Sequence, residues 1–557
     1  MRTRRAYREV LAIPDARALI GASAASQLGD WLYNAALLGY VYSATGSAAW
    51  VGAATVGRLV PYVLLGPVGG AVADRYSRRT VLLVGDLMRL VLMLVLAAVV
   101  AADGPVALVI GLTVLASSAG CAEKPAALAL LPRLVGELRL GPANALLHTV
   151  QNLGIVTGPA LGGLLLAVAP DSVAFLANAT TFACSALLIS TIRHRAAPVG
   201  TGGGARAHIA HGFRTVARTR FAIPLFVVVG MVELTYGAQT VQLVVYAERE
   251  LDLGAGGYGL LLAGAGVGGL LSAIVNGRLA SSARIALIVV TTGALACAPQ
   301  LVYAGSDALA IALAATVAGG AGLVTCEVVA ETALARVIPS ESLGRVFGVF
   351  DASTVGAMVL GALLAPVVIA STSLRASLLI LGAAALLVTL ACLAGLRGLD
   401  AVSARRTEEL RSRLAALEHL PVTAGAPQLV LERLASSTQV CPLPPGVDVV
   451  VQGAPAHAFY AIADGRVLVH RDGQRVVHLG AGDSFGERGL LDNAPRNATV
   501  TTEVDTTVLR VEGRDLLEAL QAAPTLRPAL EVSSTSPGLR VGDEGRPIVD
   551  DPSWAGA

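Results

Sequence analysis

Long apolar stretches alternate with short polar segments over residues 1–400. A helix needs about 20 mostly apolar residues to cross the hydrocarbon core of a membrane, and twelve stretches meet this requirement. A polar segment at 192–220 separates the first six from the last six. The predicted membrane-spanning helices cover residues 18–42, 48–73, 80–102, 105–131, 142–168, 171–191, 221–246, 256–276, 283–304, 307–334, 346–370 and 374–396.

The pattern changes after residue 396. Residues 397–420 have a helical period but too many charges to cross a membrane, so they predict a linker helix. Residues 421–530 contain short runs of β-branched and aromatic residues between Gly and Pro turns, such as AFYAIADGRVLVH at 458–470. That pattern is typical of antiparallel strands. Residues 531–557 are rich in Ser, Pro, Gly and Asp and are predicted to be disordered.

These patterns predict an all-α membrane bundle of twelve transmembrane helices in two six-helix halves. A small cytosolic α+β domain with an antiparallel β-barrel or jelly roll follows it. The expected parts are a cytosolic N-terminus (1–17), an N-terminal half (18–191), a central cytosolic loop (192–220), a C-terminal half (221–396), a linker helix (397–420), the small domain (421–530) and a tail (531–557).

Composition and charge support a membrane protein. Hydrophobic residues make up 54% of the chain and charged residues 14%, whereas soluble domains carry about 25% charged residues. With the N-terminus inside, twenty arginines precede the last helix in inner segments, and the outer loops carry only Arg249 and Arg375. This asymmetry predicts a multi-pass protein of the cell (inner) membrane with both termini in the cytoplasm.

The residue types present argue against an enzyme. Of 41 basic residues only Lys124 is a lysine, and Pro125 follows it, so the chain lacks a Walker-type phosphate loop. The six cysteines form neither a disulfide framework nor a metal-ligand spacing. Residues 401–557 hold 15 basic and 20 acidic residues, which gives no basic stripe for nucleic acid. We expect no catalytic activity, no cofactor, no metal and no nucleic-acid partner.

Two carboxylates fall at the middle of predicted helices, where a charge is costly unless it is paired or functional. Asp30 and Glu233 are each the thirteenth residue of the helix that leads a six-helix half, and both begin the pattern acid-x-x-Tyr-x-Ala, with Tyr33 and Tyr236. Transporters built from repeats place coupling sites near the midplane. These four residues and Arg58 are therefore the predicted transport or coupling site.

Arg58 lies at a depth similar to that of Asp30, so the two are expected to pair. Glu233 has no obvious cation in its half, which makes it the expected proton carrier; a structural or substrate-contacting role is the alternative. Charges nearer the cytoplasmic side are expected to serve packing or gating: Asp86 with Arg89, Glu123 with Lys124, Glu331 and Asp351.

The segment after the second predicted helix reads GAVADRYSRR from Gly70 to Arg79. It resembles the loop signature G-x-x-x-D-R-x-G-R-R of the major facilitator superfamily, with Ser77 in place of a glycine. The resemblance implies two six-helix halves and a gating latch whose ion pairs differ between conformations. The alternative is that the arginines only set the topology. The implied latch residues are Asp74, Arg75, Arg78 and Arg79.

The fifth predicted helix carries Gly154-x-x-x-Gly158-Pro159-x-x-Gly162-Gly163. This resembles the antiporter motif of drug/proton exchangers in the same superfamily, and it makes Gly158 and Pro159 candidate gating residues. Ordinary close packing of small residues is the alternative. The surrounding segments resemble the exporter branch that includes siderophore and macrolide exporters, from which no substrate follows.

The motif with the most fixed spacings is SFGERGLLDNAPRNATV at 484–500. It resembles the phosphate-binding cassette of cyclic nucleotide-binding domains, as in the catabolite activator protein and protein kinase A regulatory subunits. The resemblance implies these ligand-binding residues: Phe485, Gly486, Glu487, Arg496, Asn497, Ala498 and Thr499.

A cyclic phosphate is an anion that needs converging donors. Arg496 offers a charge-assisted fork, and a short helix after Gly486 offers backbone N–H groups. By resemblance, Glu487 accepts a hydrogen bond from the ribose hydroxyl. Asn497 stands where the family usually has Ala, Ser or Thr, so cAMP, the commoner bacterial ligand, is expected and cGMP is the alternative. A decayed cassette, kept only as a fold, is the competing interpretation.

These features predict a secondary active transporter, a proton-coupled exporter of an unidentified small molecule, regulated by cyclic nucleotide. Its partners are the lipid bilayer, the nucleotide and the substrate. The alternatives are a membrane-anchored cyclic nucleotide receptor that transports nothing, and an importer of the same fold.

Overall fold

The computed structural model describes residues 2–193, 214–418 and 431–522, apart from 281, 283, 339, 432, 433, 436 and 493. The chain divides into two compact units, Met1–Ser403 and Ala404–Ala557. The predicted tail at 531–557 and most of the central loop at 192–220 lie outside the described residues.

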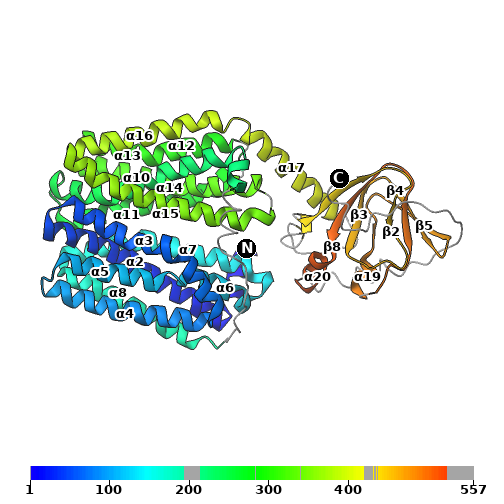
Figure 1. The fold of residues 1–557 in the computed structure, drawn as a ribbon, viewed down its shortest axis with the longest axis horizontal. Coiled ribbons are helices and arrows are strands. Elements are labelled where there is room, and N and C mark those ends of the chain that lie inside the picture. The colour runs from blue at the N-terminus through cyan, green and yellow to red at the C-terminus, as the bar shows by residue number, and fades with distance from the viewer. Residues whose placement is uncertain are drawn as a thin grey trace. The chain divides into compact units, whose positions relative to one another are not determined.

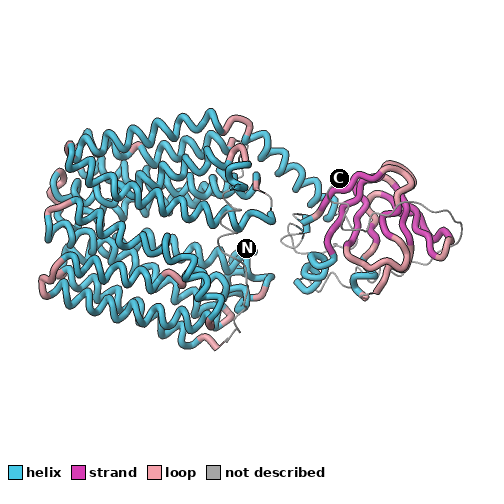
Figure 2. Tube along the Cα trace, in the orientation of Figure 1, coloured by secondary structure: helices cyan, strands magenta, loops and turns pink. Residues whose placement is uncertain are grey.

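The first unit is built of helices (Figures 1 and 2). A short helix, α1 (Arg2–Leu11), comes first, and every predicted span corresponds to one helix or to two consecutive helices. The bundle helices are α2 (Pro14–Thr45), α3 (Ala48–Arg75), α4 (Arg78–Ala101), α5 (Val106–Gly120), α6 (Glu123–Val135), α7 (Glu137–Val168), α8 (Asp171–Thr191), α10 (Ala222–Arg249), α11 (Gly254–Ala280), α12 (Ile285–Cys297), α13 (Pro299–Gly305), α14 (Leu309–Val337), α15 (Ser340–Ser371) and α16 (Leu374–Gly395).

Ten segments within the described residues are long and apolar enough to cross a membrane. The predicted count of twelve adds α2 and α7, each 32 residues long, to these ten. Two of the ten are broken helices. In one of them α12 ends at Cys297 and α13 begins at Pro299, a residue that fits the first turn of a helix but not its interior. In the other, the break between α5 and α6 places Glu123 in the first turn of a new helix.

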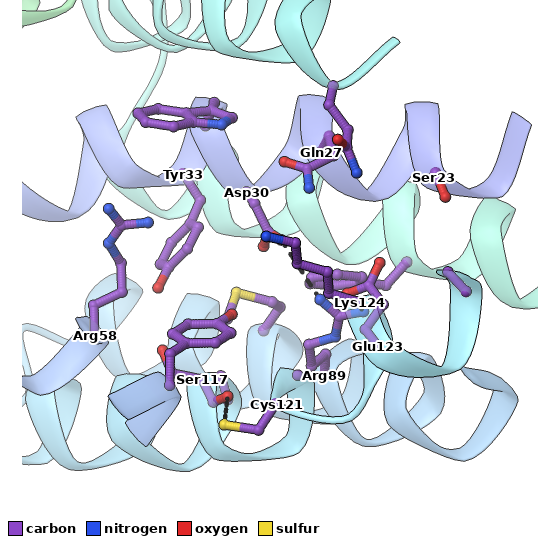
Figure 3. Close-up of a pocket in the computed structure, with 18 of the residues that line it drawn as sticks. Ser23, Gln27, Asp30, Tyr33, Arg58, Arg89, Ser117, Cys121, Glu123 and Lys124 are labelled. Atoms are coloured by element: carbon purple, nitrogen blue, oxygen red, sulfur yellow. Dashed lines mark hydrogen bonds and ion pairs between the residues drawn. The ribbon is translucent and has the colours of Figure 1, made fainter. Parts of the chain in front are cut away.

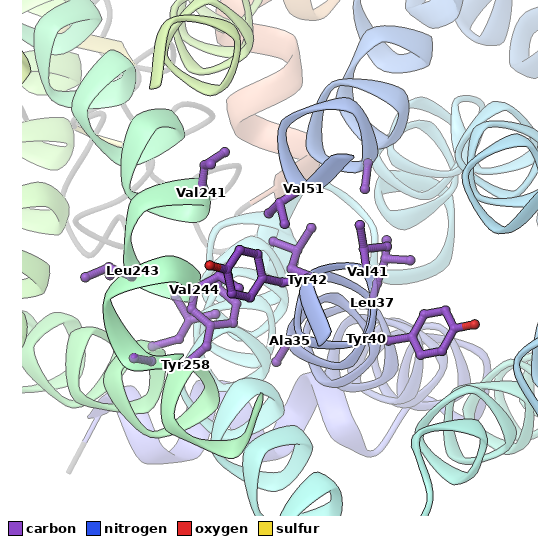
Figure 4. Packing of buried hydrophobic residues seen from close by; sticks show 14 of the residues in the cluster. Ala35, Leu37, Tyr40, Val41, Tyr42, Val51, Val241, Leu243, Val244 and Tyr258 are labelled. Atoms are coloured by element: carbon purple, nitrogen blue, oxygen red, sulfur yellow. The ribbon is translucent and has the colours of Figure 1, made fainter. Parts of the chain in front are cut away.

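The two six-helix halves share an apolar cluster at one end and pack separately at the other. Figure 4 shows the shared cluster, in which Tyr42 of α2 points toward Val244 of α10, and to which Tyr258 of α11 also belongs. At the end where α16 continues toward α17 (Leu399–Glu418), each half has its own cluster. One is built from helices α1 to α8 except α5, and the other from α10, α12, α14, α15, α16 and the start of α17. Apolar packing therefore joins the halves most strongly at the end away from the second unit's attachment.

Small residues bring α7 close to α2. A Cβ atom at Gly158 would lie 2.5 Å from the Cβ of Trp31 and 2.9 Å from the carbonyl oxygen of Leu28. Gly154 and Gly162 make similar approaches one turn to either side. A larger residue at Gly158 must therefore push the two helices apart.

The second unit contains, within its described residues, two four-stranded antiparallel sheets (Figure 1). Their orders are β1-β8-β3-β6 and β2-β7-β4-β5. Apolar side chains from both sheets, including Val449, Ile462 and Val508, form the core. The strands are β1 (Gln439–Leu443), β2 (Asp448–Val450), β3 (Ala458–Asp464), β4 (Arg466–Arg471), β5 (Gln474–Gly480), β6 (Ser484–Phe485), β7 (Thr499–Thr502) and β8 (Thr506–Glu512), with short helices α19 (Glu487–Leu491) and α20 (Gly513–Ala522). The predicted fold class, a helical membrane bundle followed by a small antiparallel domain, is confirmed.

Helix α17 (Leu399–Glu418) runs from one unit into the next. In the first unit, Leu399 is fully buried, and the Asp400 carboxylate accepts a hydrogen bond of 2.9 Å from the backbone N–H of Ala286 at the start of α12. In the second unit, Leu417 is fully buried with Phe459 of β3. Each end of α17 is thus fixed in the core of one unit.

Candidate functional sites

A cavity of about 270 Å³ lies within the N-terminal half (Figure 3). Five charged side chains from four helices line it: Asp30 (α2), Arg58 (α3), Arg89 (α4), Glu123 and Lys124 (α6). Helices facing lipid do not place charges at this depth without a partner or a function. The cavity is therefore the candidate site of the membrane unit.

Arg89 is the centre of a buried charge network. Its side chain is 3% exposed, and Nη2 lies 2.7 Å from Oδ1 of Asp86 and 2.7 Å from Oε2 of Glu123. Nη1 lies 3.5 Å from Oδ2 of Asp30. The Asp86 carboxylate also accepts a hydrogen bond of 2.6 Å from the hydroxyl of Ser185 on α8. One guanidinium thus ties α2, α4 and α6 together, and three carboxylates surround a single cation.

This network corrects the expected pairing of Asp30 with Arg58. Asp30 instead forms its ion pair with Arg89, and Figure 3 shows Tyr33 between Asp30 and Arg58. Equal depth was the reason for the expected pair, but depth does not fix which way a helix turns a side chain.

The expected pairing of Glu123 with Lys124 is also wrong. Glu123 contacts Arg89, whereas Lys124 Nζ lies 3.5 Å from Oδ2 of Asp351 on α15. Consecutive residues on a helix point in different directions, so neighbours in sequence cannot face each other there. The Lys124–Asp351 pair joins the two halves, and both of its side chains are exposed.

Glu233 lies on α10 in the C-terminal half and is partly buried. It makes no hydrogen bond or ion pair with the described part of the chain, and the charged group that acts on it is Glu327 of α14, a like charge. Tyr236 follows one turn further along α10. The surroundings of Glu233 thus differ from those of Asp30, which has Arg89 beside it.

The loop between α3 and α4 holds the four latch candidates. Arg79 donates hydrogen bonds to the carbonyls of Ile189 (3.2 Å) and Ser190 (2.6 Å) at the end of α8, where helix carbonyls lack partners and the dipole is negative. Arg78 is buried, at 7% exposed. Asp74 and Arg75 are exposed, and neither forms an ion pair with a described residue.

In α7, Gly158 serves the close contact with α2, as the small-residue pattern predicts. The side chain of Pro159 lies outside the described residues.

In the second unit, the cassette occupies β6, α19 and the loop into β7. Gly486 has a φ of +91°, and a Cβ atom there would lie 2.7 Å from Nη1 of Arg496, so only glycine fits. Arg496 is 4% exposed. Its Nη1 donates to the carbonyl of Gly486 and its Nη2 to the carbonyl of Ala458, each at 2.8 Å. The guanidinium is thus held between the cassette and β3.

Glu487 lies in the same cassette and is 7% exposed. Its Oε2 makes no hydrogen bond with any residue that the structure describes. Burial raises the pKa of Glu487 above its ordinary value of 4.5, while the nearby Arg496 charge opposes that rise. A buried acceptor without a donor costs about 1–3 kcal/mol, so this oxygen is a position where an external hydroxyl can bind favourably.

Phe485 has a different role from the one its place in the motif implies. Its ring is 6% exposed and stacks on Tyr460 in the barrel core, with 5.2 Å between ring centroids. The ring therefore builds the barrel that supports the cassette.

The two residues after Arg496, Asn497 and Ala498, precede β7, and Thr499 begins it. The Asn497 side chain is exposed and Ala498 is partly buried. The Thr499 hydroxyl accepts a hydrogen bond of 3.0 Å from the backbone N–H of Gln452. Asn497 therefore has room to contact a ligand, whereas the Thr499 hydroxyl is engaged within the barrel.

Comparison with known proteins agrees with both units. Residues 11–420 match the family described as transmembrane secretion effector, and residues 440–523 match the cyclic nucleotide-binding domain. The first match covers most of the chain. The protein therefore belongs to the transmembrane secretion effector family of major facilitator superfamily (MFS) transporters and carries a C-terminal cyclic nucleotide-binding domain.

Individual relatives fit the same division. The uncharacterized MFS-type transporter YfiS of Bacillus subtilis (strain 168) is 25% identical over 361 residues, which are 62% of this chain and 84% of YfiS. The crystal structure of a mutant of the nucleoside transporter NupG has a similar fold, with a TM-score of 0.56 at 13% identity, over 68% of this chain and 99% of NupG. A cGMP-dependent protein kinase of Eimeria tenella is 32% identical over 120 residues, which are 22% of this chain and only 12% of the kinase.

Proposed function

We propose that this protein is a proton-coupled exporter of a small organic molecule whose activity is regulated by a cyclic nucleotide bound to its C-terminal domain. In this proposal the protein spans the cell (inner) membrane, and both of its termini lie in the cytoplasm. The transport part rests on one observation above all: charged side chains of four helices line a cavity inside the membrane bundle.

Two features of the bundle support alternating access. Shared apolar packing joins the halves at one end, whereas the end next to α17 has separate clusters. This is the arrangement expected of a transporter that faces the α17 side, the cytoplasmic side in our proposal. In the opposite state, Asp74 and Arg75 would form the ion pairs that they lack here and act as the latch.

Proton coupling is assigned to Glu233, with Asp30 as the second candidate. Glu233 has no cation beside it and a like charge on α14, so its ionised form is poorly stabilised and a proton can bind and leave as the surroundings change. Asp30 shares Arg89 with two other carboxylates, an arrangement that favours binding of a proton as well.

A flux experiment tests transport and coupling together. The full-length protein is reconstituted in vesicles with the pH dye pyranine inside. Three dansyl probes of one aromatic body and different charge are added in turn: dansylglycine (anionic), dansylglycinamide (neutral) and dansylcadaverine (cationic). Proton/substrate exchange makes the lumen alkaline as a probe enters, whereas symport makes it acidic.

We expect alkalinisation with at least one probe, its loss in Glu233→Gln, and no change in the control Asp103→Asn. Asp103 lies in an exposed loop at φ 50°, a conformation that Asn also adopts. Acidification of the lumen would indicate symport, and the proposal would change from export to import. The absence of proton movement with any probe would refute the transport proposal.

Regulation rests on the cassette geometry. Arg496 is fixed as a buried cation and Glu487 offers a buried oxygen without a donor, which suits a ligand that combines an anionic phosphate with a sugar hydroxyl. Helix α17, with Leu399 and Leu417 buried in different units, is the proposed path by which binding alters the bundle. We propose cAMP as the ligand, with cGMP the competitor.

Calorimetric titration of the full-length protein with each nucleotide tests the binding step. We expect heat of binding with cAMP, weaker binding with cGMP, and loss of both in Arg496→Gln. If cGMP bound more tightly, cGMP would replace cAMP as the proposed ligand. If neither nucleotide produced heat, the cassette would be a fold retained without ligand binding. Binding without any effect on flux would favour the receptor that transports nothing.

A further inference from the structure

Arg58 and Lys124 are the cavity cations outside the network around Arg89, and Lys124 pairs with Asp351. Arg58 makes no ion pair or hydrogen bond with any described residue, and this includes its buried Nε. The group that faces its guanidinium is the ring of Trp31, 5.9 Å from the guanidinium carbon. A guanidinium without an ion pair is unfavourable at this depth, so we expect a bound molecule to supply the negative charge or hydrogen-bond acceptor that Arg58 lacks.

The contact between α3 and α10 shows what faces Arg58 from the other half. Thr55 of α3 meets Thr240 of α10, with 3.5 Å between their hydroxyl oxygens. The start of α3 and the end of α10 share the same apolar cluster, so these helices run in opposite directions. Arg58 and Tyr236, each about one turn from that contact toward the α17 end, therefore lie at the same depth on facing helices.

Hydrogen-bond donors gather at this end of the cavity. Tyr33 of α2 lines the cavity together with Arg58, and Tyr236 faces Arg58 from α10. The donors come from α2, α3 and α10, and hence from both halves. Asp30, the carboxylate on the adjoining wall, is engaged with Arg89.

We propose that Arg58 and the hydroxyls of Tyr33 and Tyr236 bind the anionic group of the transported substrate, whose flat apolar body packs against Trp31 and Tyr62. The substrate class is an organic anion with an aromatic or planar body, such as an aryl carboxylate. A guanidinium and several phenols supply donors for carboxylate oxygens, and an indole and a phenol supply apolar faces. This inference rests on the proposed transport function, because it assigns the substrate of that same cavity.

Binding of the three dansyl probes tests the substrate class separately from flux. The full-length protein is placed in nanodiscs, and equilibrium dialysis is run against empty nanodiscs as the blank. We expect dansylglycine to bind best and Arg58→Gln to weaken it roughly tenfold to a hundredfold. The affinity for neutral dansylglycinamide should stay within about twofold in that variant. The matched control is Arg249→Gln, which removes an exposed arginine outside the cavity and should leave all three affinities unchanged.

Several results would overturn this assignment: tighter binding of dansylcadaverine, no binding of dansylglycine, or unchanged dansylglycine affinity in Arg58→Gln. Thermal unfolding supplies a second readout. Because Arg58 makes no ion pair or hydrogen bond with a described residue, Arg58→Gln should unfold at the same temperature or higher, and a marked fall would show a structural role instead. If dansylglycine binds in an Arg58-dependent way but no probe drives proton flux, the binding site stands and the transport proposal is refuted. If only cationic dansylcadaverine drives flux, the transport proposal stands and the organic-anion substrate class is refuted.

Discussion

Replacing Glu487 by glutamine separates ligand binding from stability in the nucleotide-binding domain. The carboxylate is 7% exposed, and one of its oxygens has no hydrogen-bond partner among the described residues. A hydrogen bond from a ligand hydroxyl to a charged acceptor contributes about 1.5–3 kcal/mol, so Glu487→Gln should weaken cAMP binding roughly tenfold to a hundredfold. The same change removes a buried charge, so the free energy of unfolding should stay equal or rise.

The pKa of Glu487 gives this prediction a pH dependence. Burial raises the pKa above 4.5, so the folded protein holds a proton on this group at pH values where the unfolded chain has lost it. The contribution of Glu487 to stability therefore falls as the pH rises from 4.5 through the raised pKa and stays low above it. Nucleotide affinity changes in the opposite sense, because a ligand hydroxyl donates best to the ionised carboxylate, and it should fall as the pH drops through the same interval.

Calorimetric titration of the full-length protein at a series of pH values measures the affinity, and denaturant unfolding of the same samples measures the stability. The control is Glu512→Gln, which changes an exposed glutamate paired with Arg510 at 2.8 Å. The reasoning would be refuted if Glu487→Gln bound cAMP as tightly as the wild type, or if the pH dependence of binding were unchanged in that variant.

Three further predictions concern the membrane bundle and its link to the second unit. Arg89→Gln leaves three carboxylates without their cation, so it should destabilise the bundle by about 3–5 kcal/mol. Part of this stability should return at low pH, where the carboxylates are protonated. A melting temperature in detergent like that of the wild type would contradict the network. Gly158→Leu should lower the melting temperature and the flux, because its Cβ would lie 2.5 Å from that of Trp31. The control is Gly277→Leu, because nothing lies within 4 Å of a Cβ atom at that position. Equal effects of the two substitutions would refute the close contact between α7 and α2. Asp400→Ala removes the hydrogen bond to the start of α12, so cAMP should still bind while its effect on flux shrinks; an unchanged effect would exclude α17 as the path.

The fold could be predicted closely because its causes are local in the sequence. Apolar length determines membrane spans, and each predicted run corresponds to helix in the structure. The helix breaks were not foreseen, because the sequence around Pro299 and Glu123 is apolar enough to continue a span. In the second unit, turn glycines and alternating strands indicated the barrel, and the fixed spacing from Gly486 to Arg496 indicated the cassette.

The candidate site in the bundle was predicted only in part. The depth of Asp30, Arg58 and Glu233 followed from their positions within the runs, but the direction of each side chain depends on contacts between helices distant in sequence. Arg89 was assigned to a local pair with Asp86, whereas the structure gives it two more carboxylates from other helices. An arginine in the middle of an apolar run was the available signal that it had more than one partner.

The proposed regulation is tested most directly by the rate of probe-driven proton flux in vesicles with and without saturating cAMP on the side of the second unit. We predict that cAMP changes the initial rate by at least about fivefold in the wild type and has no effect in Arg496→Gln. Equal rates with and without cAMP in a wild-type protein that binds the nucleotide would contradict the account.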